Sequence, residues 1–193
     1  MSKKLRPWRV LESKEVFGSG IFRLKVERLE LPEGRVMPRY YVMDFPDWVH
    51  ALAVTADQQM VMLRQYRHAG KDSFWEIPGG SMNWSAQEGA TESPLEAAQR
   101  ELKEETGYTS QKWLSVAQHH PNPALQSNRM HVFLALDCQL TDSPQLDAFE
   151  ELQVELHPVK EVYKALDRGE IAHSLMAASL AAARSHLSSI LGK

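Results

Sequence analysis

The chain has 193 residues, enough for one sizeable domain with a hydrophobic core but too few for two average domains. Apolar residues make up 43% and charged residues 24%, which excludes a disordered, collagen-like or disulfide-scaffold chain. With 22 Lys and Arg against 25 Asp and Glu, the net charge of −3 gives no basic surface for a polyanion, so we expect no nucleic-acid partner.

Three features of the sequence indicate the cellular compartment of the protein. The basic N-terminus has no apolar run behind it and is therefore not a secretory signal. The late apolar stretch from Ile171 to Leu191 is alanine-rich and interrupted by polar residues, which favours an amphipathic helix over a membrane span. The single cysteine, Cys138, cannot form an internal disulfide. We expect a cytoplasmic protein with no membrane partner.

The first third of the chain alternates between apolar and charged residues, as strands do. The segment 22–27, a turn at Pro32-Glu33-Gly34 and the segment 36–43 predict a hairpin. A second pair of strands is expected over 49–56 and 60–66, and its near-continuous apolar run indicates a buried strand. Shorter strands are expected over 113–117, 130–136 and 152–156.

One helix is strongly signalled between these strands. Ser93 is placed to cap it, Pro94 suits its first position and Glu96 completes a capping box. Gly107 is the residue best able to take the left-handed conformation that ends it. Two further helices, over 159–168 and 172–191, show apolar stripes that predict core packing and nothing more.

Three carboxylates lie within one turn near the end of the first helix. Glu101, Glu104 and Glu105 repel one another, and the helix dipole disfavours anions there by a few tenths to about 1 kcal/mol each. Such a run is usually a solvated face, with Arg100 and Lys103 as ion-pair partners. A bound hard cation resolves the conflict better, because all-oxygen ligands suit Mg²⁺ or Mn²⁺ that share phosphate oxygens with a substrate.

A longer pattern surrounds these carboxylates. Seven residues separate Glu92 from the run Arg100-Glu101-Leu102-Lys103-Glu104-Glu105-Thr106-Gly107-Tyr108, and Glu76-Ile77-Pro78-Gly79-Gly80 precedes both. This pattern resembles the signature of the Nudix hydrolases. The leading glycine of that signature belongs six positions before Glu92, where this chain has Ala86. Gly80 is its counterpart, which leaves six extra residues in the loop 81–91.

The resemblance implies a fold, a metal and a reaction. The fold is of the α/β class, an α/β/α sandwich with a mixed sheet. Glu101, Glu104 and Glu105 become ligands of Mg²⁺ or Mn²⁺, with the backbone carbonyl of Gly79 as a further ligand. Glu104, Glu105 and Arg100 are then catalytic residues, Arg100 orienting a glutamate; the alternative for Arg100 is an ordinary surface ion pair. The implied reaction is hydrolysis of a P–O–P bridge in a nucleoside diphosphate linked to another group.

Upstream residues narrow the resemblance to one branch. Arg64-Gln65-Tyr66-Arg67, followed nine residues later by Glu76, is similar to the ADP-ribose and nucleotide-sugar pyrophosphatases. The branch implies an N-terminal strand-rich extension over 1–48 that serves a homodimer, and a hydrolase domain over 49–193. Arg67 is a candidate for binding the substrate diphosphate, since a guanidinium makes paired charge-assisted bonds to phosphate; the alternative is an ordinary charge at the end of a strand. Glu76 is a candidate for a ribose hydroxyl, for metal binding or for capping its own turn.

Two loops supply the remaining candidates. In the branch, the base that activates the attacking water comes from a loop after the sheet, and the acidic loop here is Asp147-Ala148-Phe149-Glu150-Glu151. We place Glu150 first and Glu151 second. The paired acids of the branch would need an acid at Ala148, so the alternatives are a displaced base, a hydroxide supplied by the bound metal, or a merely solvated loop. Asn128 and Arg129 lie in a polar loop between two strands, where they are candidates for sugar or phosphate contacts or for a turn-forming role.

The function we predict is metal-dependent hydrolysis of nucleoside diphosphate sugars, ADP-ribose or an NDP-hexose, to a nucleoside monophosphate and a sugar phosphate. A second hypothesis is hydrolysis of dinucleoside polyphosphates or nucleoside triphosphates, which would use the same helix and a different substrate pocket. A sensor that binds nucleotide sugars without cleaving them is a third hypothesis. The complete set of carboxylates argues against the sensor, because binding alone does not require them.

Overall fold

The computed structural model describes residues 5–83 and 92–192, and these form two compact units. The first unit contains the chain up to Pro46 together with His120–Arg129, and the second contains Asp47–His119 and the chain from Met130 onward. The functional division into 1–48 and 49–193 stays a prediction. The extra residues expected between Gly80 and Glu92 fall mostly in 84–91, outside the described residues.

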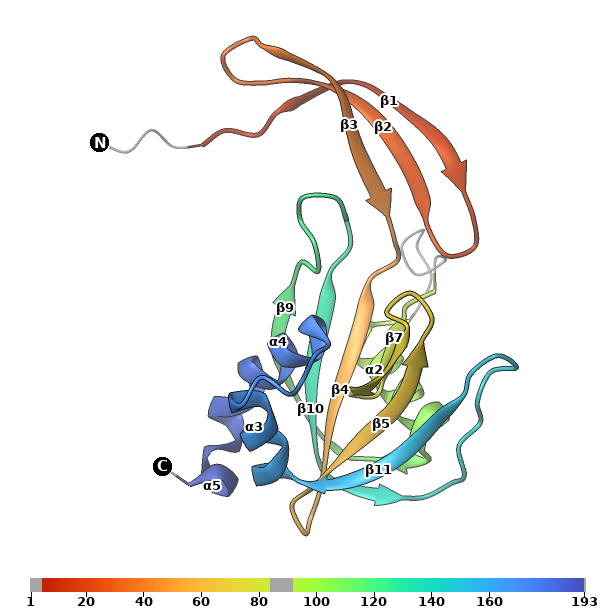
Figure 1. Cartoon of the computed structure of the whole chain (residues 1–193), viewed down its shortest axis with the longest axis vertical. Helices are drawn as coiled ribbons and strands as arrows, with labels where there is room; N and C mark the ends of the chain where they lie inside the picture. The colour runs from red at the N-terminus through yellow and green to blue at the C-terminus, as the bar shows by residue number, and fades with distance from the viewer. Residues whose placement is uncertain (1–4, 84–91, 193) are drawn as a thin grey trace. The chain divides into compact units, whose positions relative to one another are not determined.

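The first unit is built on a three-stranded antiparallel sheet in the order β1-β2-β3. Its strands are β1 (Arg9–Gly18), β2 (Arg23–Glu30) and β3 (Val36–Asp44) (Figure 1). The predicted hairpin is the β2–β3 pair, whose turn contains Gly34 at a φ of 84°. The sequence did not predict β1, because nearly all of its residues are exposed and it lacks the alternation of a half-buried strand.

The second unit contains an eight-stranded mixed sheet. Its main path runs β11-β5-β4-β10-β8, and β6, β7 and β9 pair with β5, β4 and β10 respectively. β4 and β10 are parallel, while every other pair is antiparallel. The strands are β4 (Trp48–Thr55), β5 (Gln59–Arg67), β6 (Asp72–Glu76), β7 (Gly79–Ser81), β8 (Tyr108–Thr109), β9 (Lys112–His119), β10 (Met130–Leu140) and β11 (Leu152–Pro158).

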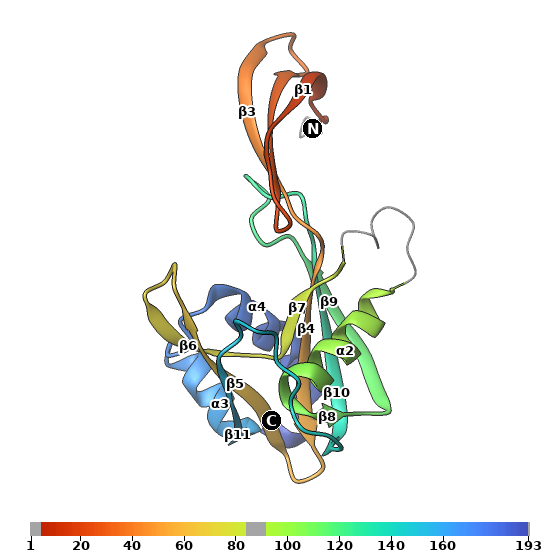
Figure 2. The ribbon, with the colours of Figure 1, turned by 90° about the vertical axis from the view of Figure 1, so that its right-hand side faces the viewer.

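Helices cover both faces of this sheet (Figure 2). On one face α2 (Pro94–Thr106) buries Ala98 and Leu102 against Val49 and Ala51 of β4. On the other face α3 (Val159–Asp167) and α4 (Ser174–Ala183) pack on the opposite side chains of the same strand. Strand β4 thus contributes side chains to two hydrophobic cores, as its near-continuous apolar run predicted. The predicted α/β/α sandwich with a mixed sheet is confirmed.

The expectation of one continuous helix over 172–191 was wrong. α4 gives way to a 3-10 turn, η1 (Arg184–Leu187), and then to the short helix α5 (Ser188–Leu191). The guanidinium of Arg184 lies 4.8 Å from the centre of the Tyr163 ring, which ties the interruption to α3. Leu187 is buried although it lies in the 3-10 turn, so an apolar spacing of three and four residues did not reveal the break. In the described part of the chain, no helix is long and apolar enough to cross a membrane.

Candidate active site

The helix that carries the carboxylates begins and ends where the sequence predicted. The side chain of Ser93 accepts from the backbone of Glu96, and the Glu96 carboxylate accepts from the backbone of Ser93. Gly107 ends the helix with a φ of 74°. A Cβ on Gly107 would lie 2.1 Å from the backbone oxygen of Asp142, so only glycine fits this position.

Two further residues of α2 are buried. Ala97 is fully buried in the same core as Ala98 and Leu102. Glu105 is also buried, at 4% exposure, because the helix packs against the segment that carries Gly79. The carboxylate cluster therefore extends from the solvent edge of the helix into the protein.

Arg100 organises the exposed side of this cluster. Its Nη1 donates to Glu101 at 2.9 Å and to Glu104 at 3.0 Å, and its Nε donates to Glu92 at 2.8 Å. These hydrogen bonds, led by that to Glu92, raise the pKa of the guanidinium further, so Arg100 stays charged. Glu92 was part of the sequence pattern but was given no role, and the structure places it as a partner of Arg100.

The buried side of the cluster faces a gap in the sheet. β4 and β5 are paired only at Ala53 with Val61 and at Val54 with Met60. Beyond that point β6 pairs with β5 and β7 with β4, so the segment joining β6 to β7 runs between the two strands. The amide of Gly79 in this segment donates to the Glu105 carboxylate at 2.8 Å.

Both glycines of this segment lie close to other atoms, and at Gly79 the neighbour is backbone, so only glycine fits there. A Cβ on Gly79 would lie 2.1 Å from the backbone oxygen of Val49, and a Cβ on Gly80 would lie 2.5 Å from Oε1 of Glu101. Gly80 thus makes room for a carboxylate of α2. This contact supports its assignment as the counterpart of the signature's leading glycine.

Arg67 and Glu76 form a two-pronged ion pair. Nε of Arg67 donates to Oε1 of Glu76 at 2.7 Å, and Nη2 donates to Oε2 at 2.5 Å. Glu76 is 2% exposed, whereas the Arg67 side chain is 48% exposed. The hydrogen bonds that Arg67 donates to Glu76 raise the pKa of Arg67, and the negative charge of Glu105 adds to this. The pair therefore presents a fixed cation beside the carboxylate cluster.

The acidic loop brings a further carboxylate under the influence of this cluster. The loop is closed by a hydrogen bond from the amide of Glu150 to the backbone oxygen of Asp147 at 2.9 Å. Glu150 is half-buried and Glu151 is exposed. Burial raises the pKa of Glu105 well above its ordinary value, against the hydrogen bond from Gly79, and the charges of Glu101 and Glu150 raise it further.

The donor set fits a hard divalent cation. Within residues 5–83 and 92–192, no three His, Cys, Asp or Glu side chains are arranged to hold a metal ion as they stand, and Glu101 and Glu104 are engaged with Arg100. Burial raises the pKa of Glu101 as well as that of Glu105, so an excess of carboxylate charge is held partly out of water. Oxygen-only donors in such a cluster suit a cation that binds carboxylates and retains waters.

The remaining candidates, Asn128 and Arg129, belong to the first compact unit. Asn128 is 2% exposed, and neither its amide nitrogen nor its amide oxygen has a hydrogen-bond partner within the described residues. Substrate binding by Asn128 and Arg129 stays a prediction.

A carboxylate-bearing helix packed on a glycine segment within an α/β/α sandwich is the arrangement that the resemblance to the Nudix hydrolases implied. A model of the NUDIX domain matches residues 45–179. Because this match covers more than half of the chain, the chain belongs to the NUDIX family, and the predicted family membership is confirmed.

Individual relatives agree with this assignment. The chain is 30% identical over 164 residues to the ADP-ribose pyrophosphatase of Bacillus subtilis, covering 84% of this chain and 85% of that protein. It is 27% identical over 173 residues to the ADP-ribose pyrophosphatase of Mycobacterium tuberculosis, covering 89% and 81%. A crystal structure of an ADP compounds hydrolase has the same fold, with a TM-score of 0.81 at 23% identity over 97% of this chain and 98% of that one.

Proposed function

We propose that this chain hydrolyses nucleoside diphosphate sugars of the ADP-ribose type. Water attacks the diphosphate bridge, so that ADP-ribose and water give AMP and ribose 5-phosphate. The observation that carries the proposal is the carboxylate cluster of α2 beside the Arg67–Glu76 pair, which provides ligands for a metal ion and a cation for a diphosphate. Relatives named ADP-ribose pyrophosphatases along most of the chain support this substrate class.

Each residue of the cluster has a proposed role. Glu101, Glu104 and Glu105, with the backbone carbonyl of Gly79, would hold Mg²⁺ or Mn²⁺, which when bound polarises the phosphate and acidifies a water. Arg67 binds the diphosphate, and Glu76 holds the guanidinium in place. Glu150 takes the proton from the attacking water. Arg100 keeps Glu101 and Glu104 on one side of the helix.

We also propose a cytoplasmic homodimer formed through the sheet of the first unit. Within the described part of this unit, Leu29 is the only apolar residue other than proline that is buried. Val10, Val16 and Ile21 are each at least half exposed. A three-stranded sheet with so little core of its own requires another surface to cover it.

The test is a product assay over a panel of substrates with Mg²⁺ and with Mn²⁺. The panel contains ADP-ribose, GDP-mannose, UDP-glucose, diadenosine polyphosphates and nucleoside triphosphates. We expect AMP and ribose 5-phosphate from ADP-ribose, with the highest kcat/KM in the panel and complete loss in excess EDTA. A higher kcat/KM on a nucleoside triphosphate or a diadenosine polyphosphate, or full turnover in EDTA, would overturn the proposal.

A further inference from the structure

The segment Glu76-Ile77-Pro78-Gly79 joins β6 to β7 through the gap between β4 and β5, and it contributes to the proposed site at both ends. Glu76 pairs with Arg67 at one end, and Gly79 donates to Glu105 at the other. Small movements of this backbone would therefore displace a phosphate-binding cation and a metal-binding carbonyl together. What holds the backbone between these ends bears directly on catalysis.

The backbone groups of the segment have few alternatives for hydrogen bonding. The backbone oxygen of Pro78 accepts from the amide of Ala51 at 2.8 Å, and proline has no amide hydrogen to donate. The amide of Gly79 is used by Glu105. The amide of Ile77 remains, in a residue that is 1% exposed and out of reach of water. A buried amide of this kind needs an acceptor.

The acceptor is the thioether of Met176, near the start of α4. The distance from the Ile77 nitrogen to Sδ of Met176 is 3.1 Å, and Met176 is 3% exposed. A thioether is a weak acceptor, yet here it is the group that reaches this amide from the helix on the far side of the sheet. Glu105 of α2 and Met176 of α4 thus hold the same segment from opposite faces.

We propose that Met176 is a positioning residue of the active site, acting through the backbone between Glu76 and Gly79; this inference rests on the proposed hydrolase function. The sequence pattern assigns Met176 only to the apolar stripe of a packing helix. Leucine would fill a similar volume but would leave the Ile77 amide without an acceptor. The peptide linking Glu76 to Ile77 would then be free to turn away from the position that the site requires.

The experiment compares Met176→Leu with Met60→Leu. Met60 is fully buried in the same core, and its sulfur makes no hydrogen bond within the described residues, so its replacement measures the packing effect alone. Two quantities are measured: exchange of the Ile77 amide hydrogen by NMR in metal-free protein, and kcat and KM on the best substrate. The first needs neither metal nor substrate, so it does not depend on the proposed reaction.

We expect Met176→Leu to speed Ile77 exchange by about tenfold or more relative to Met60→Leu, and to lower kcat by a similar factor. KM should rise as well, because the same backbone carries Glu76, which holds Arg67 in place. Equal Ile77 exchange in the two variants, or faster exchange with an unchanged kcat, would overturn the proposal. Rapid Ile77 exchange in the unmodified protein would overturn it without any variant. Absence of ADP-ribose hydrolysis by the unmodified protein would instead count against the proposed function.

Discussion

Glu105 combines burial with a candidate catalytic role, and its replacement separates the two. Burial raises the pKa of Glu105, so the folded protein favours the protonated carboxyl. The folded state is therefore more stable at low pH, and this added stability is lost as the pH rises through the raised pKa. Gln keeps an oxygen for the Gly79 amide and carries no charge. We therefore expect Glu105→Gln to lower kcat by orders of magnitude while making the metal-free protein more stable at neutral pH.

The measurement is urea denaturation of both metal-free proteins at a series of pH values, together with kcat. The stability advantage of the variant should shrink as the pH falls and the native carboxyl becomes protonated. A variant that unfolds at lower urea than the native protein at neutral pH, yet keeps its kcat, would show that Glu105 is a structural residue.

Glu150 and Glu151 provide a matched pair for locating the base. Glu150 is half-buried and its charge acts on Glu101 and Glu105, whereas Glu151 is exposed. We expect Glu150→Gln to reduce kcat by about 10²- to 10⁴-fold with little change in KM, as loss of a general base does. Glu151→Gln should stay close to the native rate. If both variants keep a near-native kcat in steady-state assays, the acidic loop is only a solvated surface.

At the scale of elements, α2 owes its position to signals that lie within a few residues of its ends. Ser93 and Glu96 satisfy amide groups of the first turn, and Ser93→Ala removes one of these bonds. We expect a loss of about 1 kcal/mol in the free energy of unfolding, with a modest fall in kcat/KM because the capped turn leads to Arg100. The control is Ser13→Ala on β1, where the exposed hydroxyl donates to Glu27 at 3.0 Å, so the change removes one exposed hydrogen bond without touching a helix cap. Urea denaturation of the two variants makes the comparison, and equal losses would mean that the cap contributes nothing specific.

The same locality explains what could be predicted from the sequence. The bounds of α2, the main strands of the sheet and the carboxylate cluster follow from capping residues, alternation and a contiguous motif. The contact between Ile77 and Met176 joins residues 99 positions apart, and no local pattern marks it. The pairing of Arg67 with Glu76 depends on the register of β5 and β6, and the very short strands β6, β7 and β8 carry too few residues to show a period.

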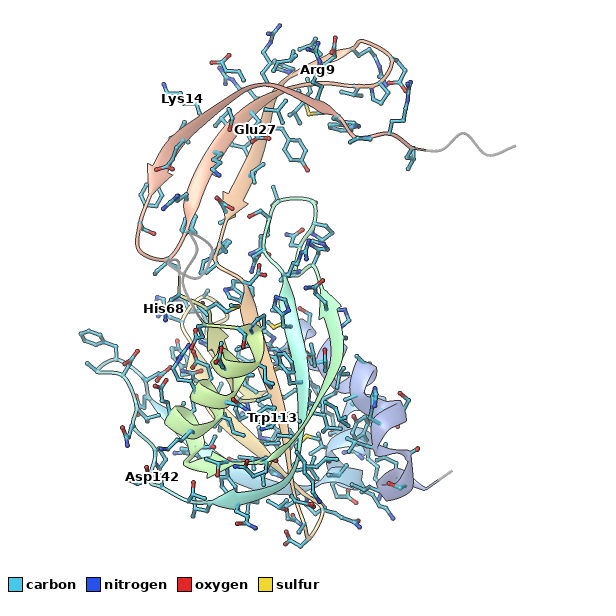
Figure 3. The ribbon with its side chains drawn as sticks, turned by 180° about the vertical axis from the view of Figure 1, so that it is seen from behind. Arg9, Lys14, Glu27, His68, Trp113 and Asp142 are labelled. Carbon is cyan, nitrogen blue, oxygen red and sulfur yellow. The ribbon has the colours of Figure 1, made fainter. Side chains whose placement is uncertain are left out.

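At the scale of the whole molecule, the first unit is the part of the chain through which we propose that the homodimer forms. Its sheet carries exposed ion pairs, such as that in which Nε of Arg9 donates to Oε2 of Glu30 at 2.8 Å. Figure 3 shows Arg9, Lys14 and Glu27 on its strands. Its exposed apolar residues include Val10 and Val16 on β1. Ion pairs at such exposed positions contribute about 0–1 kcal/mol, so they give the sheet little stability of its own. Burial of the apolar residues in a second copy of the chain would supply more.

We therefore expect sedimentation velocity to show a homodimer at assay concentrations and the double variant Val10→Glu, Val16→Glu to shift it toward monomer. Placing charges on an apolar interface opposes its burial, whereas Lys14→Gln, a change at an already polar position of β1, should leave the dimer intact. If the unmodified chain sediments as a monomer, the exposed valines have another role and the first unit does not serve dimerisation. If both variants stay dimeric, copies of the chain associate through a different surface.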